Sequence, residues 1–224
     1  MQTGRSGLLI TVEGIDGSGK TTQVDRLCAR LTQVGRAFVR TREPGGTPIG
    51  DKIRALLLDP ASDMTALAEV YLYAASRAEH VARVMRPALE KGLIVVCDRF
   101  VDASIAYQGY GLRSAGITPD LVRQVNDQAV GGVMPTRTFV VDVPVQVASA
   151  RLRASGRQQF GGEDRIERRG PAFFEQVRSG LAAIGQADPG RVVRVDGQQS
   201  VEQVAAEIWR DVEALLGSFD GPDA

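Results

Sequence analysis

The sequence predicts an α/β fold in which helices cover both faces of a parallel β-sheet. Three observations support this prediction. Short apolar runs typical of strands alternate along the chain with segments whose apolar residues have helical spacing. Residues 93–97 are continuously apolar, as strands buried on both faces of a sheet are. A glycine-rich segment, residues 14–21, follows the first apolar run and opens the first helix.

The elements are expected in a regular order. Residues 8–12 are a β-branched run that ends at a glycine, and residues 23–34 then repeat apolar side chains at helical spacing. Further strands are expected at residues 37–40, 93–97, 138–143 and 192–195. Further helices are expected at residues 49–58, 67–91, 121–130, 145–153 and 201–216. The polar segment 154–170, rich in Gly and Arg, is expected to be a lid, and residues 219–224 a frayed tail.

Length and composition limit the class of protein. With 224 residues and 43% hydrophobic content, we expect a single domain over residues 1–224. The 27 basic and 27 acidic residues cancel, which argues against a nucleic-acid or membrane partner. Residues 1–7 lack the apolar core of a signal peptide, and no run of about 18 apolar residues occurs. We expect Cys28 and Cys97 to be free thiols of a cytoplasmic protein.

Residues 14–21 read GIDGSGKT and fit the Walker A pattern GxxxxGK[ST]. Glycines let successive backbone N–H groups point at an anion beside the positive end of a helix dipole. In such a loop Lys20 reaches the β- and γ-phosphates, and the Thr21 hydroxyl faces Mg²⁺. The motif predicts a nucleoside triphosphate site and leaves the reaction open.

A second anchor is the pair Asp98-Arg99, directly after the apolar run 93–97. Ligands of doubly wound sheets bind at the carboxyl ends of strands, so Asp98 should emerge beside the glycine-rich loop. A carboxylate at that place can hold Mg²⁺ or its water ligands. The alternative is a capping or ion-paired couple without a ligand.

In four segments the chain resembles thymidylate kinases, in the same order along the sequence. These segments are residues 13–22 (EGIDGSGKTT), residues 41–47 (TREPGGT), residues 98–109 (DRF, then Ser104 and AYQG), and residues 164–167 (DRIE). The resemblance implies a P-loop NTPase fold with three α/β/α layers, a five-stranded parallel sheet and a lid, in a homodimer. It implies that ATP and Mg²⁺ phosphorylate dTMP to dTDP on the way to dTTP.

The resemblance also implies roles for matching residues. Arg42 and Arg99 are expected to clamp the acceptor phosphate, because two guanidinium groups suit a dianionic monoester. Asp16 is expected near the acceptor sugar and the phosphate-side metal shell. Tyr73 is expected to stack on thymine, with Arg77 one helical turn later reaching a base carbonyl. Further substrate-binding positions are Glu43, Pro44, Ser104, Tyr107 and Gln108, and the ATP-binding positions are Gly14, Ile15, Asp16, Gly17, Ser18, Gly19, Lys20, Thr21 and Thr22.

Several of these residues have structural alternatives. Tyr71 and Tyr73 are also compatible with core aromatics, and Arg77 is compatible with a surface charge. Gln108 and Gly109 are compatible with a plain turn. The only histidine, His80, is expected to be structural, because phosphoryl transfer depends on positioning and charge stabilisation.

The lid is where the chain departs from the family pattern. The glycine-rich loop contains no arginine, and thymidylate kinases of this kind supply a basic residue from the lid. The candidates are Arg151, Arg153, Arg157 and Arg165. Relatives with short lids often carry arginine at the position of Ser155, whereas here Arg157 and an additional stretch, residues 158–162, follow Gly156. We expect Arg157 to close over the transferring phosphoryl group and take Arg153 as the second candidate, with Glu167 a weaker candidate for sugar or metal-water contacts.

Two other functions compete with this interpretation. A different nucleoside monophosphate or deoxynucleoside kinase would share the glycine-rich loop and Asp98-Arg99 but differ in the base pocket. A nucleotide-dependent switch or partitioning protein would bind without turnover, but guanine-binding switches need an Asn-Lys-x-Asp motif that this sequence lacks. Lys20 and Thr21, together with Asp98 and Arg99, argue against an inactive paralogue.

Overall fold

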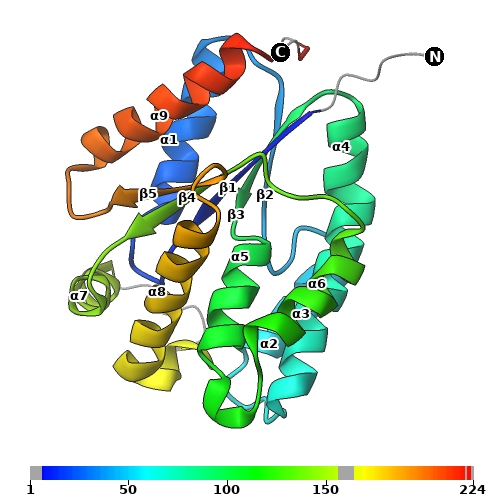
Figure 1. The fold of residues 1–224 in the computed structure, drawn as a ribbon, viewed down its shortest axis with the longest axis vertical. Coiled ribbons are helices and arrows are strands. Elements are labelled where there is room, and N and C mark those ends of the chain that lie inside the picture. The colour runs from blue at the N-terminus through cyan, green and yellow to red at the C-terminus, as the bar shows by residue number, and fades with distance from the viewer. Residues whose placement is uncertain (1–6, 156–163, 220, 223–224) are drawn as a thin grey trace.

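The computed structural model describes residues 7–155, 164–219 and 221–222, and a five-stranded parallel sheet runs through them (Figure 1). The strand order is β2-β3-β1-β4-β5, and every neighbouring pair is parallel. The strands are β1 (Leu8–Glu13), β2 (Phe38–Arg42), β3 (Ile94–Asp98), β4 (Arg137–Asp142) and β5 (Val192–Asp196). The predicted P-loop α/β architecture is therefore confirmed. The carboxyl end of the central strand β1 lies between those of β3 and β4.

Helices cover both faces of the sheet, as Figure 1 shows. Helices α1 (Lys20–Gln33) and α9 (Val201–Gly217) lie on one face, where their apolar side chains pack on Ile10 and Val12 of β1. Leu9 belongs to the cluster on the opposite face. This alternation follows from the period of two in a strand, which sends successive side chains to opposite faces.

Most of the remaining helices lie on the second face or at the carboxyl edge. They are α2 (Pro48–Leu58), α3 (Ala66–His80), η1 (Val81–Met85), α4 (Arg86–Glu90), α5 (Val101–Ser104), η2 (Ile105–Tyr110), η3 (Arg113–Ala115), α6 (Pro119–Val130), α7 (Val145–Ser155), η4 (Glu167–Arg169) and α8 (Gly170–Ala187). The helix expected at residues 67–91 is continuous, but its middle, η1, is π-helical. Prolines at the first turns of α2 and α6 follow Thr47 and Thr118, whose side chains cap these helices.

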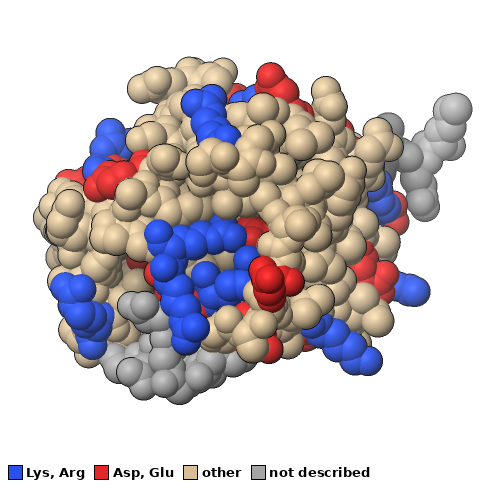
Figure 2. Space-filling model, turned by 90° about the horizontal axis from the view of Figure 1, so that it is seen from below, with Lys and Arg blue, Asp and Glu red and all other residues tan. Residues whose placement is uncertain are grey.

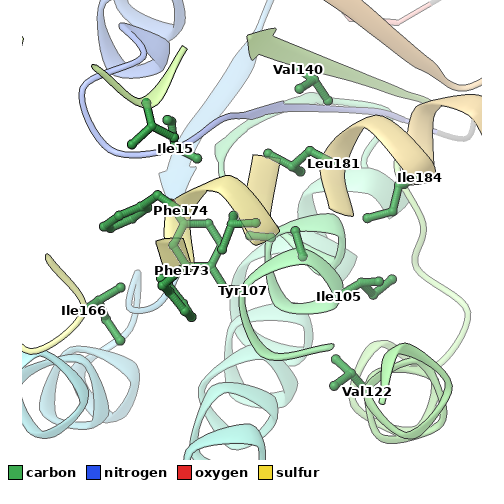
Figure 3. Close-up of a cluster of buried hydrophobic side chains, with 14 of the residues drawn as sticks. Ile15, Ile105, Tyr107, Val122, Val140, Ile166, Phe173, Phe174, Leu181 and Ile184 are labelled. Atoms are coloured by element: carbon green, nitrogen blue, oxygen red, sulfur yellow. The ribbon is translucent and has the colours of Figure 1, made fainter. Parts of the chain in front are cut away.

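Helix α8 has no counterpart in the sequence prediction. Its apolar residues lie three or four apart, and Figure 3 shows Phe173, Phe174, Leu181 and Ile184 turned toward the segment that contains Tyr107. The rings of Phe173 and Tyr107 pack edge to face with centroids 6.0 Å apart. Helix α8 thus packs against and supports the π-helix η2. Gln108 and Gly109 lie within η2, so the alternative of a plain turn at these residues is wrong.

Two further sequence expectations concern the cysteines and the membrane. Cys28 and Cys97 are both free, as expected, and both are buried. Within the described ranges, no helix combines the length and apolarity needed to cross a membrane.

Candidate functional site

The glycine-rich loop joins β1 to α1 in a conformation that depends on its glycines. Gly14, Gly17 and Gly19 have φ values of 150°, 82° and 98°, a region that other residues rarely adopt. A Cβ atom on Gly17 would lie 2.3 Å from the carbonyl oxygen of Ala148. Helix α1 begins at Lys20 without a side-chain cap, so its first N–H groups remain available to an anion.

Lys20 and Arg99 converge on one carboxylate, that of Asp16. Arg99 Nη2 lies 2.9 Å from Asp16 Oδ1, and Lys20 Nζ lies 3.3 Å from the same atom. Burial raises the pKa of Asp16, but the charges of Arg99 and Lys20 outweigh burial and hold that pKa well below its usual range. Asp16 is therefore an anion that orients both cations at the mouth of the loop.

Asp98 and Thr21 form the oxygen-rich part of the site. The Thr21 hydroxyl donates to Asp98 Oδ2 at 2.8 Å, and Asp98 Oδ1 is buried without a partner among the described residues. No group of three or more acidic, His or Cys side chains suited to a metal occurs in the described part of the chain. A hydroxyl and one carboxylate fit Mg²⁺, which keeps water ligands and takes oxygens from phosphates.

Two hollows meet at this point. The larger cleft is lined by the glycine-rich loop, Asp98 and the end of β2, and the narrower cavity is lined by α3, α5 and η2. Both linings include Arg54 and Arg99, together with the carboxylates Asp16, Glu43 and Asp164. Figure 2 shows Lys and Arg side chains gathered around a central hollow on this face of the molecule. The arrangement places a junction of arginines and carboxylates between a phosphate-binding loop and a partly apolar cavity.

Three arginines from separate elements surround the junction. Arg99 follows β3 with a φ of 70°, Arg42 ends β2, and Arg54 lies on α2 and donates to the carbonyl oxygen of Pro44 at 3.2 Å. Burial lowers the pKa of Arg54, and the charges of Arg42 and Arg99 lower it further. Three guanidinium groups this close favour an anion between them. Sequence reasoning missed Arg54, because one arginine on an amphipathic helix has no distinguishing pattern.

Arg42 is placed differently from Arg99. Its side chain is 54% exposed, 3.7 Å from Asp51, and it lines only the larger cleft. Arg42 therefore has freedom to move toward a bound phosphate, whereas Arg99 is fixed by Asp16 and by Tyr107, whose hydroxyl accepts from Arg99 Nη2 at 2.9 Å.

Arg77 lies in the wall of the narrower cavity and is only 1% exposed, so the alternative of a surface charge is wrong. Its guanidinium donates to Glu43 at 2.8 Å, Ser104 at 2.9 Å and the carbonyl oxygen of Phe100 at 3.0 Å. It also donates to Asn126 Oδ1 of α6, so four partners fix one planar cation.

Tyr73 lies one turn earlier on α3 and also lines this cavity, together with Pro44, Tyr107 and Gln108. Tyr71 is 54% exposed, so it is not a core aromatic. Tyr73 and Arg77 of α3 are therefore brought together with Ser104, Tyr107 and Gln108, which lie about thirty residues later in the sequence. Phe100, Asp164 and Ile166 join them, and sequence reasoning had not placed these residues in the cavity.

The lid arginines are only partly described. Arg157 lies outside the described residues. Arg153 is exposed near the end of α7 and lines neither hollow. Arg151 lines the cleft and donates to the carbonyl oxygens of Ser18 at 3.2 Å and Gly197 at 2.9 Å. Arg165 turns away from the loop and pairs with Glu69 at 2.7 Å.

Comparisons with known proteins agree with one another. The family model described as thymidylate kinase matches residues 12–208. The thymidylate kinase of Exiguobacterium sibiricum is 48% identical over 212 residues, 94% of this chain and 96% of that protein. The thymidylate kinase of Symbiobacterium thermophilum is 45% identical over 93% of this chain and 94% of that protein. The crystal structure of thymidylate kinase from Ehrlichia chaffeensis superposes with a TM-score of 0.72 at 33% identity, over 93% of this chain and 99% of that one.

Proposed function

The chain belongs to the thymidylate kinase family and is a dTMP kinase, and from this premise we propose that it transfers the γ-phosphoryl group of ATP, with Mg²⁺, from the larger cleft to dTMP held in the narrower cavity. The observation that carries the proposal is that the two hollows share Arg54 and Arg99, together with the carboxylates Asp16, Glu43 and Asp164. A donor and an acceptor bound on either side of this junction would meet beside two guanidinium groups. Phosphoryl transfer gains most of its rate from such positioning and charge stabilisation.

On the donor side, the backbone of residues 14–22 would surround the β- and γ-phosphates. Lys20 is buried, and burial and the charge of Arg99 lower its pKa, against the charges of Asp16 and Asp98. A phosphate in the loop would favour the charged ammonium form of Lys20 and draw the ammonium group away from Asp16. The 3.3 Å contact between Lys20 Nζ and Asp16 Oδ1 is consistent with a phosphate replacing Asp16 as the partner of Lys20.

Thr21 and Asp98 would hold the Mg²⁺ that accompanies ATP. The buried, unpartnered Asp98 Oδ1 supports this assignment, because an orphaned carboxylate oxygen is costly unless something binds it. Bound there, the cation would neutralise charge on the phosphate oxygens.

On the acceptor side, Arg99 and Arg54, joined by Arg42, would clamp the phosphate of dTMP. The positive φ of Arg99 and its contacts with Asp16 and Tyr107 support its role as the fixed member of the clamp. Asp16 would lie near the sugar. A pre-oriented guanidinium loses little entropy when it binds a phosphate.

The base would lie between Tyr73 and the wall that contains Arg77. Arg77 is buried and held at three of its nitrogens, which supports a fixed contact with a base carbonyl. Glu43 and Pro44 would close one end of the cavity. Its wall would be formed by Ser104, Tyr107 and Gln108.

For the lid we propose residues 154–170, within one domain that spans residues 1–224, and a basic residue supplied from the lid. The loop between Gly14 and Gly19 contains no arginine, which supports this type of lid. Arg157 remains the first candidate. Arg153, exposed and close to the end of α7, is the second.

We also place the protein in the cytoplasm as a homodimer, with dTMP and ATP and no nucleic acid or membrane as partners. The two free cysteines are consistent with a reducing compartment. Large apolar side chains are exposed on the adjoining helices α2 and α3, at Ile49, Leu56, Leu67 and Tyr71. Exposed large apolar side chains on two adjoining helices are typical of a subunit interface.

The decisive experiment is a coupled assay of ADP release with ATP, Mg²⁺ and a panel of monophosphates, namely dTMP, dUMP, dCMP and dGMP. We expect dTMP to give the highest kcat/KM. Faster turnover of dCMP or dGMP would assign the cavity to another base, and no turnover with any acceptor would point to a nucleotide-dependent switch.

A further inference from the structure

A buried acidic residue, Glu69 of α3, connects the narrower cavity to the segment that precedes α8. Glu69 is 1% exposed and is not among the residues that line the cavity. Its Oε2 atom forms ion pairs with Arg165, at 2.7 Å, and with Arg169. Its Oε1 atom accepts a hydrogen bond from Gln108 Nε2 at 3.0 Å.

The two arginines determine the charge of Glu69. Burial raises the pKa of its carboxyl group, but the charge of Arg169, the hydrogen bonds and the charge of Arg165 together outweigh burial and lower that pKa below its ordinary value. Glu69 is therefore ionised, and an ionised carboxylate only accepts hydrogen bonds.

The charge of Glu69 in turn fixes the orientation of the Gln108 amide. A side-chain amide has one end that donates and one that accepts, and only the NH₂ end can face a carboxylate. The other end, Oε1, is buried and has no partner among the described residues. Gln108 is 1% exposed and lines the cavity beside Ser104 and Tyr107. Because a buried acceptor without a partner is costly, the Gln108 oxygen on the cavity wall favours a ligand that donates a hydrogen bond to it.

We propose that Glu69 is a positioning residue for base selection: by holding the NH₂ group of Gln108, it makes the cavity present a hydrogen-bond acceptor to the base. The proposal rests on the proposed function of this cavity. Thymine and uracil carry a hydrogen on ring nitrogen N3, so N3 can donate to such an acceptor. The N3 atom of cytosine has a lone pair, so it would oppose the Gln108 oxygen and leave both acceptors unpaired.

The test compares two substrates in one preparation of each variant. Glu69→Gln keeps the shape of the side chain but offers either a donor or an acceptor, so the Gln108 amide is free to turn over. We expect the ratio of kcat/KM for dTMP to that for dCMP to fall by about tenfold to a hundredfold, the range that an unpaired buried group costs. Because both substrates meet the same folded enzyme, partial unfolding of the variant cancels in the ratio.

A double-mutant cycle with Gln108→Leu separates positioning from general damage. If Glu69 acts through Gln108, Glu69→Gln lowers the ratio in the wild-type background and leaves it unchanged in the Gln108→Leu background. A ratio that does not change in the first background, or changes equally in both, overturns the proposal. Wild-type enzyme that does not prefer dTMP to dCMP would instead overturn the proposed function of the cavity.

Discussion

His80 holds Glu43 through a hydrogen bond of 2.9 Å between Nδ1 and Oε1, and both side chains are buried, although Glu43 also lines both hollows. The second oxygen of Glu43 accepts from Arg77, and the other ring nitrogen of His80 contacts the Thr41 hydroxyl at 2.6 Å. His80 lines neither hollow, so it supports the cavity wall from outside. This agrees with the expectation that the only histidine is structural.

Replacement of Arg77 tests the base contact. Arg77→Ala removes a cavity-lining cation and leaves Glu43 without one of its partners, so the apparent affinity for dTMP should fall by about 1 to 3 kcal/mol, roughly tenfold to a hundredfold. The affinity for ATP should change much less. Steady-state KM values and calorimetric titrations with each nucleotide make the comparison.

The control for this variant is His80→Ala, which disturbs Glu43 from the other side and keeps the cavity wall. A smaller loss of dTMP affinity is expected there. Equal losses for dTMP and ATP in Arg77→Ala would show that Arg77 has only a structural role.

Lys20→Ala tests the donor site. Comparable electrostatic groups contribute about 3 to 4 kcal/mol to transition-state stabilisation, so turnover should fall by orders of magnitude. The variant should remain folded, because replacing Lys20 also removes the free-energy cost of burying its charge. Lys91→Ala, at an exposed position, is the matched loss of one positive charge. Turnover and thermal unfolding are measured on both, and turnover near the wild-type rate in Lys20→Ala would exclude the assignment.

Glu13, the last residue of β1, should make stability depend on pH. Burial, with help from Asp102, raises the pKa of its carboxyl group from 4.5 to about 8, so the native state binds more protons than the unfolded state between these values. The contribution of Glu13 to the free energy of unfolding is therefore fully present below pH 4.5. It is lost as pH rises toward 8, by at most about 1.4 kcal/mol per pH unit.

Glu13→Gln mimics the neutral form and retains the oxygen that accepts from the Phe100 N–H. Urea unfolding without ligands should show the variant gaining stability relative to wild type from about pH 5 to pH 8. A difference that is the same at every pH would contradict the prediction.

The interface prediction concerns α3. Tyr71 of α3 is 54% exposed, and α2 and α3 carry further exposed apolar side chains, so Tyr71→Lys would bury a charge in a dimer but cost little in a monomer. Analytical ultracentrifugation should find the wild type dimeric and the variant shifted toward the monomer. Wild-type protein that sediments as a monomer at micromolar concentration would exclude the interface.

The elements that the sequence predicted best are those with a regular pattern and a motif at one end. β1, the glycine-rich loop and α1 satisfy both conditions. Helix α8 was not predicted although Phe173, Phe174, Val177, Leu181 and Ile184 have helical spacing, because it follows a polar segment and begins without a side-chain cap. For residues 101–110 the sequence indicates pocket residues but no helix, since π-helical turns have no sequence signature.

Within the site, residues next to a motif were predictable and residues without one were not. Lys20, Thr21 and Asp98 follow from the loop and the strand end. Arg54 reaches the site because Thr47 and Pro48 set the start of α2, which turns that arginine toward Arg99. Glu69 was unpredictable, because its partners lie about forty and a hundred residues away and meet it only through packing.

The last prediction concerns the proposed lid, residues 154–170. If Arg157 supplies the charge that the glycine-rich loop lacks, its contribution arises mainly as charge spreads over the transferring group. Arg157→Ala should then lower kcat strongly with little change in dTMP affinity, because only interactions that strengthen in the transition state accelerate the step. Arginines of this kind contribute on the order of 10³ to 10⁵ in rate, and a residue on a lid should lie near the lower end.

Arg153→Ala, measured alongside Arg157→Ala, decides which of the two arginines acts. Arg153 lines neither hollow, so its replacement should slow turnover far less than that of Arg157. If only Arg153→Ala is slow, the lid mechanism stands with a different arginine. If neither variant is slow, the lid supplies no catalytic charge, and Arg151, which already contacts the carbonyl oxygen of Ser18, becomes the residue to replace next. Single-turnover rates at saturating ATP and dTMP separate these outcomes from effects on product release.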